Sequence, residues 1–474
     1  MRLLIFGLGD YYSKYKRWIR DDLIVGLLDN DTGKQGKIID GHTVYSPEKI
    51  SSLKYDLIVI LSVHEPQMRQ QLLKMGVRES DIIGSSELPD RKDILNPKAP
   101  VKVYAPESDN SSLVQKGTDN TLLLMSPNLD NNGATMVLFY AAQTLCKAGF
   151  RVVFASWHDG VIRDELVKIN IPVIVDPNLE IDTADGISWI NGFLYIICNT
   201  IHYYRFLSNR AGRSKIIWWL HEPPCFYDSL DIKRLRSIDF DDIVVCAAGP
   251  LAAKAFEKYN PQIDVKLLLY GLPDVDEKYL AQTKDLGTDD KLTALVLANV
   301  QQYKGQDVLV DAVLSLTDSE RDRICFRIIG NNNSAYAKEQ MARSASFGNC
   351  IEFCSLMDRD SVMKELRSAD LLICPSREDV MPISVCEGMQ YSRVCIVSDA
   401  AGNSAYITDE YDGLVFSSDD PEGLSRKIRW CIDHKDSLKD IGARSRKIYD
   451  DHFSMEVFGQ NIKKLINDFY GLKS

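Results

Sequence analysis

Two acidic residues in the last third of the chain stand where an apolar run gives way to a helix. Asp379 lies in the loop after the run Ala369–Cys374, and Glu387 lies about one and a half turns into the helix expected to begin near Pro382. The run is short, apolar and closed by Pro375, as a central strand of a parallel sheet would be. The N-terminus of the following helix offers free N–H groups to an anion above the strand. This arrangement is typical of a nucleotide-binding site.

The segment Pro375–Met389 resembles the acidic-x7-acidic signature of the retaining family-4 glycosyltransferases, usually Glu-x7-Glu followed by Ala-Met. In this register Asp379 matches the first acid, Glu387 matches the second, and Gly388–Met389 matches the pair after it. Aspartate replaces glutamate at the first position, and Pro382 stands where the family often has a glycine whose N–H faces the donor sugar. Both departures bear on the identity of the sugar more than on the reaction.

The resemblance implies a role for each residue of this segment. Glu387 would hold the ribose hydroxyls of a nucleotide, and Asp379 would address the donor sugar together with the N–H groups of three neighbours, Val380, Met381 and Ile383. Taken without the rest of the chain, the two acids fit a solvated helix residue and a turn former equally well. Agreement from other segments favours the binding site.

A lysine in the same part of the chain could meet the charge of a departing diphosphate. The segment Leu295–Gly305 reads as a strand and a loop, with a helix expected from Gln306, and it resembles the family's strand and Lys-Gly element. Lys304 matches the lysine that contacts the donor diphosphate, where negative charge appears when the sugar–phosphate bond breaks. Asn299 replaces the family's usual arginine, so Lys304 carries more of this role. Without the resemblance, Lys304 would be a surface lysine beside a turn glycine.

Two segments in the middle of the chain resemble the acceptor-side half of the same family. In Ser126–Gly133, which joins an expected strand to an amphipathic helix, Gly133 lets backbone approach a ligand and Asn132 can cap the helix. The buried-strand pattern Ile216–Pro223 contains His221, which matches a family histidine near the donor sugar and the acceptor. His221 could orient hydroxyls or carry a proton. The alternatives are a plain strand-to-helix turn and a histidine that caps a strand.

Strand-like and helical runs alternate almost throughout the chain, which is the pattern of doubly wound α/β domains. The resemblance predicts the α/β GT-B architecture, in which two Rossmann-like domains face each other across the active-site cleft, preceded here by a small additional Rossmann-like domain. The expected boundaries are 1–95 for the additional domain, 96–120 for a linker, 121–285 for the acceptor-side domain, 286–452 for the donor domain, and 453–474 for a C-terminal helix that crosses back to the acceptor-side domain.

The expected additional domain, residues 1–95, has a pattern of its own. Gly7 and Gly9 follow an expected strand, and Asp29 ends the next one, as in a dinucleotide-binding fingerprint. The third glycine is missing, because Tyr12 stands in its place. This domain looks like the small N-terminal domains of bacterial sugar-modifying enzymes, and a nicotinamide-dependent enzyme is one alternative function. Asp29–Asp31 also matches the metal-binding Asp-x-Asp of the other glycosyltransferase fold. Short acidic turns are common, and this one lies outside the two expected GT-B domains, so we do not assign it a metal.

Composition narrows the remaining classes. The net charge is −11 over 474 residues, which argues against broad nucleic-acid binding. The 11 cysteines include no Cys-x-x-Cys pair and read as small core residues of a reducing compartment. Cys350 and Cys354 lack the His or Cys cluster that would complete a metal site, so neither a metal nor a cofactor is expected. With no secretory signal and no apolar run of about 20 residues, we expect a cytoplasmic protein.

Two segments mix basic and aromatic residues and could touch the inner face of a membrane. The first is Tyr11–Arg20, and the second is Tyr203–Phe206 with the cations that follow it, Arg210, Arg213 and Lys215. Such mixtures interact with anionic lipid surfaces, although more often their aromatic residues pack inward. Peripheral membrane association is therefore an open expectation.

Together these segments predict a metal-independent, retaining glycosyltransferase that moves a sugar from a nucleotide-diphosphate sugar to a hydroxyl of a glycan or a lipid-linked acceptor. Bacterial surface polysaccharide or glycoconjugate assembly is the expected setting. A second alternative is a non-catalytic partner subunit that keeps the fold, which the departures at Asn299, Asp379 and Pro382 suggest.

Overall fold

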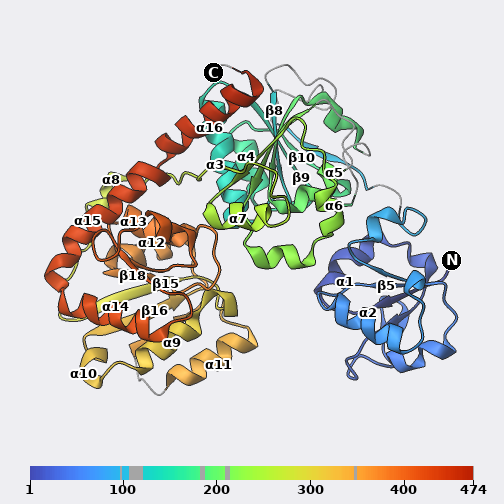
Figure 1. Cartoon of the computed structure of the whole chain (residues 1–474), viewed down its shortest axis with the longest axis horizontal. Coiled ribbons are helices and arrows are strands. Elements are labelled where there is room, and N and C mark those ends of the chain that lie inside the picture. Colours follow the sequence, from blue (N-terminus) through green and yellow to red (C-terminus); the bar gives the residue numbers. More distant parts are fainter. Residues whose placement is uncertain (97–98, 106–120, 182–186, 209–213, 346–349, 473–474) are drawn as a thin grey trace.

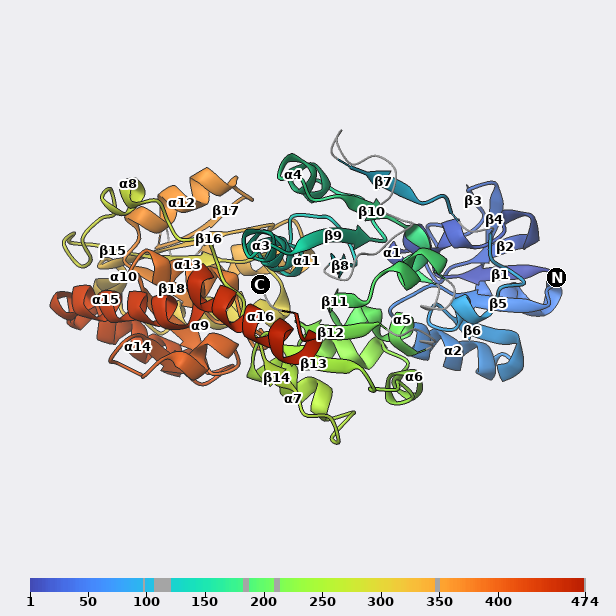
Figure 2. The ribbon, with the colours of Figure 1, turned by 90° about the horizontal axis from the view of Figure 1, so that it is seen from above.

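Three mainly parallel sheets follow one another along the chain in the computed structural model (Figure 1). The structure describes residues 1–96, 99–105, 121–181, 187–208, 214–345 and 350–472. We call each sheet with its helices the first, second or third domain. Viewed from above, the second domain lies between the other two (Figure 2). The predicted α/β fold with a small additional domain in front is confirmed.

The first domain is a six-stranded sheet in the order β3-β4-β2-β1-β5-β6. Its central strands are short apolar runs with both faces covered, and β1 and β5 are buried along their whole length. The strands are β1 (Leu3–Phe6), β2 (Ile24–Leu28), β3 (Ile38–Ile39), β4 (His42–Tyr45), β5 (Leu57–Ile60) and β6 (Ile82–Gly84), and the helices are α1 (Asp10–Tyr15) and α2 (Glu65–Lys74).

The second domain has eight strands in the order β14-β13-β12-β11-β8-β9-β10-β7. The stretch expected to be a linker contributes edge strand β7, which pairs antiparallel with β10; residues 97–98 and 106–120 of that stretch lie outside the described residues. The strands are β7 (Lys102–Tyr104), β8 (Thr121–Ser126), β9 (Arg151–Ser156), β10 (Val173–Val175), β11 (Tyr195–Asn199), β12 (Lys215–Leu220), β13 (Ile243–Ala247) and β14 (Lys266–Leu267). The helices are α3 (Gly133–Lys147), α4 (Ile162–Lys168), α5 (Tyr204–Ser208), α6 (Ile232–Arg236) and α7 (Pro250–Glu257), with α8 (Glu277–Leu280) in the following connection.

The third domain has six parallel strands in the order β17-β16-β15-β18-β19-β20. Its strands are β15 (Leu292–Leu297), β16 (Ile324–Ile329), β17 (Ile351–Cys354), β18 (Leu371–Cys374), β19 (Val394–Ser398) and β20 (Leu414–Phe416). Its helices are α9 (Gln306–Leu314), α10 (Asp318–Arg321), α11 (Ala335–Ser344), α12 (Arg359–Ser368), α13 (Ile383–Gln390), α14 (Pro421–Asp433) and α15 (Leu438–Ile448).

The last helix, α16 (Met455–Tyr470), leaves the third domain and packs on the second (Figure 1). Ser454 caps its start, and Gly471 ends it in the left-handed conformation, with φ of 73°. The Phe458 ring stacks on Trp219 of β12 with centroids 5.8 Å apart. The buried Tyr470 hydroxyl donates to the Ile196 carbonyl at 2.6 Å and accepts from the Ile217 N–H at 3.2 Å. The end of the chain thereby fixes the second domain relative to the third.

The first domain docks on the second through Glu180, whose side chain is 4% exposed. The Glu180 carboxylate accepts from Arg17 at 3.0 Å and from the Trp18 indole N–H at 3.1 Å, and Lys14 lies 3.4 Å away. Burial alone would raise the pKa of Glu180, but His158 and these cations lower it to about 2. The basic and aromatic segment considered for membrane contact therefore contributes three of its side chains to a domain interface.

The second such segment also packs inward. Tyr203, Tyr204 and Phe206 are buried, and Lys215 donates to the Phe469 carbonyl at 3.1 Å. Arg210 and Arg213 lie outside the described residues. No helix among the described residues combines the length and the apolar character needed to cross a membrane.

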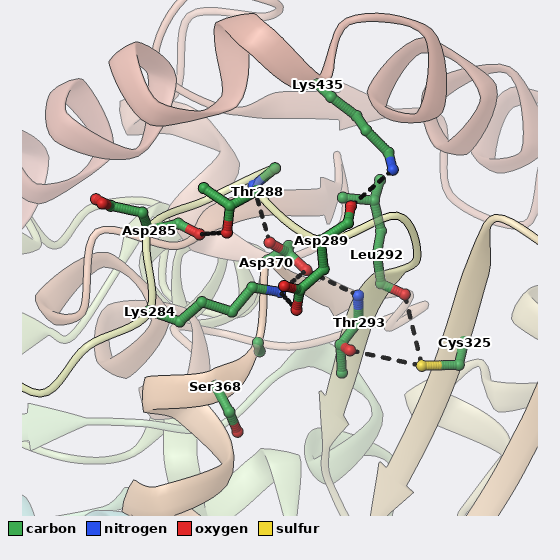
Figure 3. A network of polar contacts seen from close by, with 12 residues as sticks. Lys284, Asp285, Thr288, Asp289, Leu292, Thr293, Cys325, Ser368, Asp370 and Lys435 are labelled. Carbon is green, nitrogen blue, oxygen red and sulfur yellow. Dashed lines mark hydrogen bonds and ion pairs between the residues drawn. The ribbon is translucent and has the colours of Figure 1, made fainter.

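A buried carboxylate anchors the connection between the second and third domains (Figure 3). Asp370, at the start of β18, is 0% exposed and accepts from Lys284 Nζ at 2.9 Å and from the N–H groups of Gly287 and Thr293 at 3.0 and 2.9 Å. Lys284 also pairs with Asp289 at 2.8 Å. Both oxygens of Asp370 are thus engaged, which is the pattern of a structural ion pair.

We predict that Asp370→Ala lowers the free energy of unfolding by about 3–5 kcal/mol, because it leaves buried donors without an acceptor. The control is Asp433→Ala, which removes an exposed partner of Arg323 at 3.3 Å and should cost less than about 1 kcal/mol. Urea denaturation of both variants measures the difference. Equal, small losses would show that the Asp370 network does not hold this connection.

Candidate active site

Most of the predicted site residues meet in one cavity of about 510 Å³ between the second and third domains. It lies at the carboxyl ends of strands from both sheets, where ligands of α/β domains bind. Its lining includes Gly133, His221, Asn299, Lys304, Asp379, Val380, Met381, Ile383 and Glu387. Asn132 lines a neighbouring cavity, also of about 510 Å³, which shares Gly133, Ile383 and Glu387 with the first.

Lys304 and Asp379 form an ion pair inside this cavity, with Nζ and Oδ2 2.5 Å apart. Burial would lower the pKa of Lys304, but the Asp379 carboxylate outweighs it and raises that pKa, so the lysine is charged. The position depends on Gly305, which has φ of 69° and begins α9. A Cβ there would lie 2.0 Å from the Pro375 carbonyl oxygen, so only glycine lets this loop approach the one after β18.

Glu387 is 5% exposed and pairs with Arg359, the first residue of α12. Burial raises the pKa of Glu387, although Arg359 opposes this shift. Arg359 was missed by the sequence analysis. Its available signal was Asp358, a helix cap after β17, whose side chain accepts from the Ser361 N–H at 2.8 Å. The Arg359 side chain is 61% exposed, so a ligand that brings its own hydrogen-bond donors to the buried Glu387 carboxylate can take its place.

Two helix N-termini meet at the cavity. Asn132 caps α3, because its side-chain oxygen accepts from the Thr135 N–H at 3.1 Å, as the sequence predicted. Gly133, the first residue of α3, lies against Ile383, the first residue of α13; a Cβ on Gly133 would be 3.4 Å from the Ile383 Cδ1. The positive ends of both helix dipoles therefore face the space between the domains, which suits an anion.

The loop after β18 leaves donors free at this point. The Met381 carbonyl accepts from the Tyr270 hydroxyl of the second domain at 2.7 Å. The N–H groups of Val380 and Met381 donate to no described residue. Among the described residues, these two amides are open to a ligand.

His221 follows β12, and its ring lies 4.8 Å from that of Trp219. Burial lowers the pKa of His221 to about 3, so the imidazole is neutral at physiological pH. Its Nε2 has no hydrogen-bond partner among the described residues. The arrangement favours hydrogen bonding to a substrate hydroxyl over carriage of a proton as imidazolium.

Glu222, beside it, was also missed by the sequence analysis. It is 6% exposed and accepts from the N–H groups of Ile201 and His221 at 2.9 and 3.0 Å. Burial raises the pKa of Glu222 to about 7 despite these bonds. Its contacts hold the end of β12 in place, which orients the loop that carries His221.

The two neighbouring acids Glu378 and Asp379 point to different partners. Glu378 accepts from the Cys225 N–H of the second domain at 3.1 Å, whereas Asp379 pairs with Lys304. The Asn299 side-chain oxygen accepts from the Asn331 N–H at 3.0 Å, and this side chain is uncharged. Lys304 is therefore the cation that lines the cavity on this side.

The carboxylate of Asp29, beside the glycine-rich turn of the first domain, is bound by groups of that same domain. Asp29 accepts from the Leu8 N–H at 3.0 Å and the Asp31 N–H at 2.8 Å, and it pairs with Lys34 at 3.2 Å. Both carboxylate oxygens are engaged, and α1 has only six residues. Gly7, Gly9 and Asp29 line a cavity of about 410 Å³, and the nicotinamide-dependent alternative stays a prediction. The described residues contain no group of three His, Cys, Asp or Glu side chains placed to hold a metal ion.

Comparison with known proteins agrees with this geometry. Residues 280–448 match the family described as glycosyl transferases group 1, and residues 1–83 match the family described as C2185-like, N-terminal. Over 150 residues the chain is 26% identical to the N,N'-diacetylbacillosaminyl-diphospho-undecaprenol alpha-1,3-N-acetylgalactosaminyltransferase of Campylobacter jejuni, covering 32% of this chain and 38% of that protein. Over 165 residues it is 24% identical to an uncharacterized glycosyltransferase of Methanocaldococcus jannaschii, covering 35% and 45%. The chain thus spans less than half of either relative.

The fold is shared more widely than the sequence. The crystal structure of Anabaena HepE in complex with UDP and glucose superposes with a TM-score of 0.60 at 16% identity, covering 73% of this chain and 99% of that one. Sucrose-phosphate synthase from Thermosynechococcus elongatus gives 0.59 at 13% identity, covering 74% and 99%. The second and third domains therefore have the GT-B fold, as predicted, and these similarities support a GT-B glycosyltransferase.

Proposed function

We propose that this protein is a retaining glycosyltransferase that moves a sugar from a nucleotide-diphosphate sugar to a hydroxyl of a glycan or lipid-linked acceptor, without a metal ion. The observation that carries the proposal is the convergence of Lys304, two helix N-termini and the Glu387 carboxylate on adjoining cavities. Cations and helix dipoles suit the diphosphate, and a buried carboxylate suits ribose hydroxyls.

The donor would span both cavities. Its diphosphate and sugar would lie in the cavity that holds Lys304 and Asp379, and its nucleoside in the neighbouring one, because Glu387 lines both. The diphosphate would compete with Asp379 for Lys304, which frees the Asp379 carboxylate for sugar hydroxyls. The ribose would likewise displace Arg359 from Glu387. The UDP held by HepE makes a uridine nucleotide the first donor to examine.

In the proposed reaction, an acceptor hydroxyl attacks the anomeric carbon on the face from which the diphosphate leaves. The bond from the acceptor oxygen to that carbon forms, the carbon–oxygen bond to phosphate breaks, and the acceptor's proton passes to the departing phosphate oxygen. The protein supplies positioning and electrostatic stabilisation. Neutral His221 would hold a hydroxyl through Nε2, and Lys304 would stabilise the leaving diphosphate.

The acceptor class rests on similarity. The Campylobacter jejuni relative is named for transfer to a sugar on diphospho-undecaprenol, which supports a lipid-linked acceptor. Surface glycoconjugate assembly at the cytoplasmic face of a membrane is the setting that we propose for it. A glycan acceptor remains part of the proposal.

The direct test incubates the full chain with a panel of sugar nucleotides and with glycan and lipid-linked acceptors, with and without excess EDTA, and measures the release of nucleoside diphosphate. We expect release from at least one donor, at the same rate with EDTA, and a product whose anomeric configuration, read by NMR, matches the donor. No release from any donor would favour the non-catalytic subunit. Loss of activity that magnesium restores would refute metal independence, and an inverted product would refute retention.

Replacing the lysine of the cavity tests the electrostatic part of the mechanism. We expect Lys304→Ala to lower kcat by a few hundredfold, because loss of one preorganised contact to a developing charge costs about 3–4 kcal/mol. Lys338→Ala, which removes an exposed lysine of α11, serves as the matched control and should leave kcat unchanged. A Lys304→Ala rate within about threefold of the parent would remove the diphosphate role.

The neighbouring acids provide a second matched pair. Asp379→Asn should lower turnover strongly, since it removes the charge beside Lys304, whereas Glu378→Gln keeps an oxygen for the Cys225 N–H and should change turnover little. Turnover with the intact donor measures both. The opposite ranking would shift the acidic motif by one residue.

A further inference from the structure

The first and second domains enclose a third cavity, of about 520 Å³, that the proposed donor site does not use. Parallel strands of both sheets end beside it. Ser62 and Ser86 follow β5 and β6 of the first domain, and Trp157 and Arg205 follow β9 and β11 of the second domain. The carboxyl ends of two parallel sheets therefore face each other here, as they do across the other cleft, and this is where α/β domains bind ligands.

One wall holds a buried cation without a full set of partners. Arg205 is 7% exposed, and its Nη2 donates to the Ser86 carbonyl across the domain boundary. Its Nη1 has no hydrogen-bond partner among the described residues. A buried charge with an unused donor is costly unless an anion completes it.

A second cation lies on the opposite wall. Lys14, from α1, lines the cavity and is 3.4 Å from Glu180, which it shares with Arg17. The other acids of the lining are Glu65, which pairs with Arg69 at 2.9 Å, and Asp228. The pKa of His202 is lowered to about 4 by burial and then by Lys14, with Glu180 opposing. Lys14 thus adds to the lowering of the His202 pKa in spite of the nearby carboxylate.

The remaining walls are aromatic. Tyr11 and Tyr15 from the first domain and Trp157 and Tyr204 from the second line the cavity. Flat apolar faces beside a few directed polar groups are typical of sites for ring-containing ligands. The lining fits a sugar ring that carries a negative charge.

A single loop separates this cavity from the proposed active site. His221 lines the cleft cavity, whereas Cys225, in the 3₁₀ helix Pro224–Ser229, lines the cavity beside the first domain. The Cys225 N–H in turn donates to Glu378, next to Asp379. A ligand in the cavity beside the first domain therefore lies next to the loop of the second, acceptor-side domain that carries His221.

We propose that this cavity binds the anionic part, a phosphate or carboxylate, of a sugar-containing acceptor, with Arg205 and Lys14 as the cations that hold it. This assignment rests on the proposed function, and it gives the first domain a role, because that domain supplies half of the walls. The reacting hydroxyl then reaches toward His221 around the loop.

The test measures binding to the full chain without any donor. The soluble probes are glucose 1-phosphate and glucuronate, with methyl glucoside as the neutral analogue. Their binding is measured by calorimetry. Vesicles of phosphatidylcholine with and without phosphatidic acid form the lipid arm. We expect at least one anionic probe to bind tenfold or more tightly than its neutral counterpart. Binding in the soluble arm indicates a charged glycan, and binding confined to vesicles indicates a lipid phosphate.

Two variants assign that binding to the cavity. Arg205→Met should weaken it at least tenfold, and Lys14→Met, at a side chain that is 42% exposed, keeps the test valid if the first variant fails to fold. Arg236→Met, an exposed arginine of α6 outside the lining, should bind like the parent. Equal binding by parent and cavity variants, or no preference for charged probes, would overturn the proposal.

Binding of UDP, measured separately, distinguishes the two proposals. If UDP fails to bind while the anionic probe binds through Arg205, the transferase assignment is at fault and the anion site stands. If UDP binds to all variants while no probe does, the donor site stands and the anion site is wrong.

Discussion

The carboxyl edge of the second sheet is the constraint on which the other features depend. All central strands of that sheet run parallel, so the loops that follow them emerge at one edge of the sheet. The contacts of these loops with the first and the third domain therefore both form at that edge. The loops after β8 and β12 carry Gly133 and His221 to the third domain, and those after β9 and β11 carry Trp157 and Arg205 to the first. The second domain is thus a shared wall between two cavities, and its loop at Cys225 borders both.

Ion pairs in this molecule fall into two kinds. Asp370 is fully buried, and two backbone N–H groups and Lys284 saturate it, so no ligand has room to compete. The pairs Lys304–Asp379 and Arg359–Glu387 lie in the lining of the cavities between the second and third domains. Arg359 is 61% exposed, and the Lys304 side chain is 21% exposed. A ligand can exchange with these pairs because it replaces one charge contact with another. Arg205 differs from both kinds, because its Nη1 has no hydrogen-bond partner among the described residues.

Much of the fold followed from local patterns. The expected strand Ala369–Cys374 contains β18, the cap at Asn132 was recognised from its residue type, and α9 begins at Gln306 as expected. Short apolar runs closed by Pro or Gly, alternating with helical periods, determine an α/β class because each unit forms from neighbours in sequence. The strand β7 was not expected, since its three residues stand in a polar stretch and form a strand only by pairing with β10.

The candidate site divides in the same way. Sequence by itself indicated the acidic pair, Lys304 and His221, because each stands in a segment that resembles a motif of the glycosyltransferase family. Tertiary structure alone showed that Lys304 pairs with Asp379 and that Arg359 pairs with Glu387. It also showed that the basic segment near the N-terminus binds Glu180 of the second domain. These contacts join residues far apart in the chain. They depend on how the three sheets are placed against one another, which hydrophobic periodicity and turn chemistry, being local, do not encode.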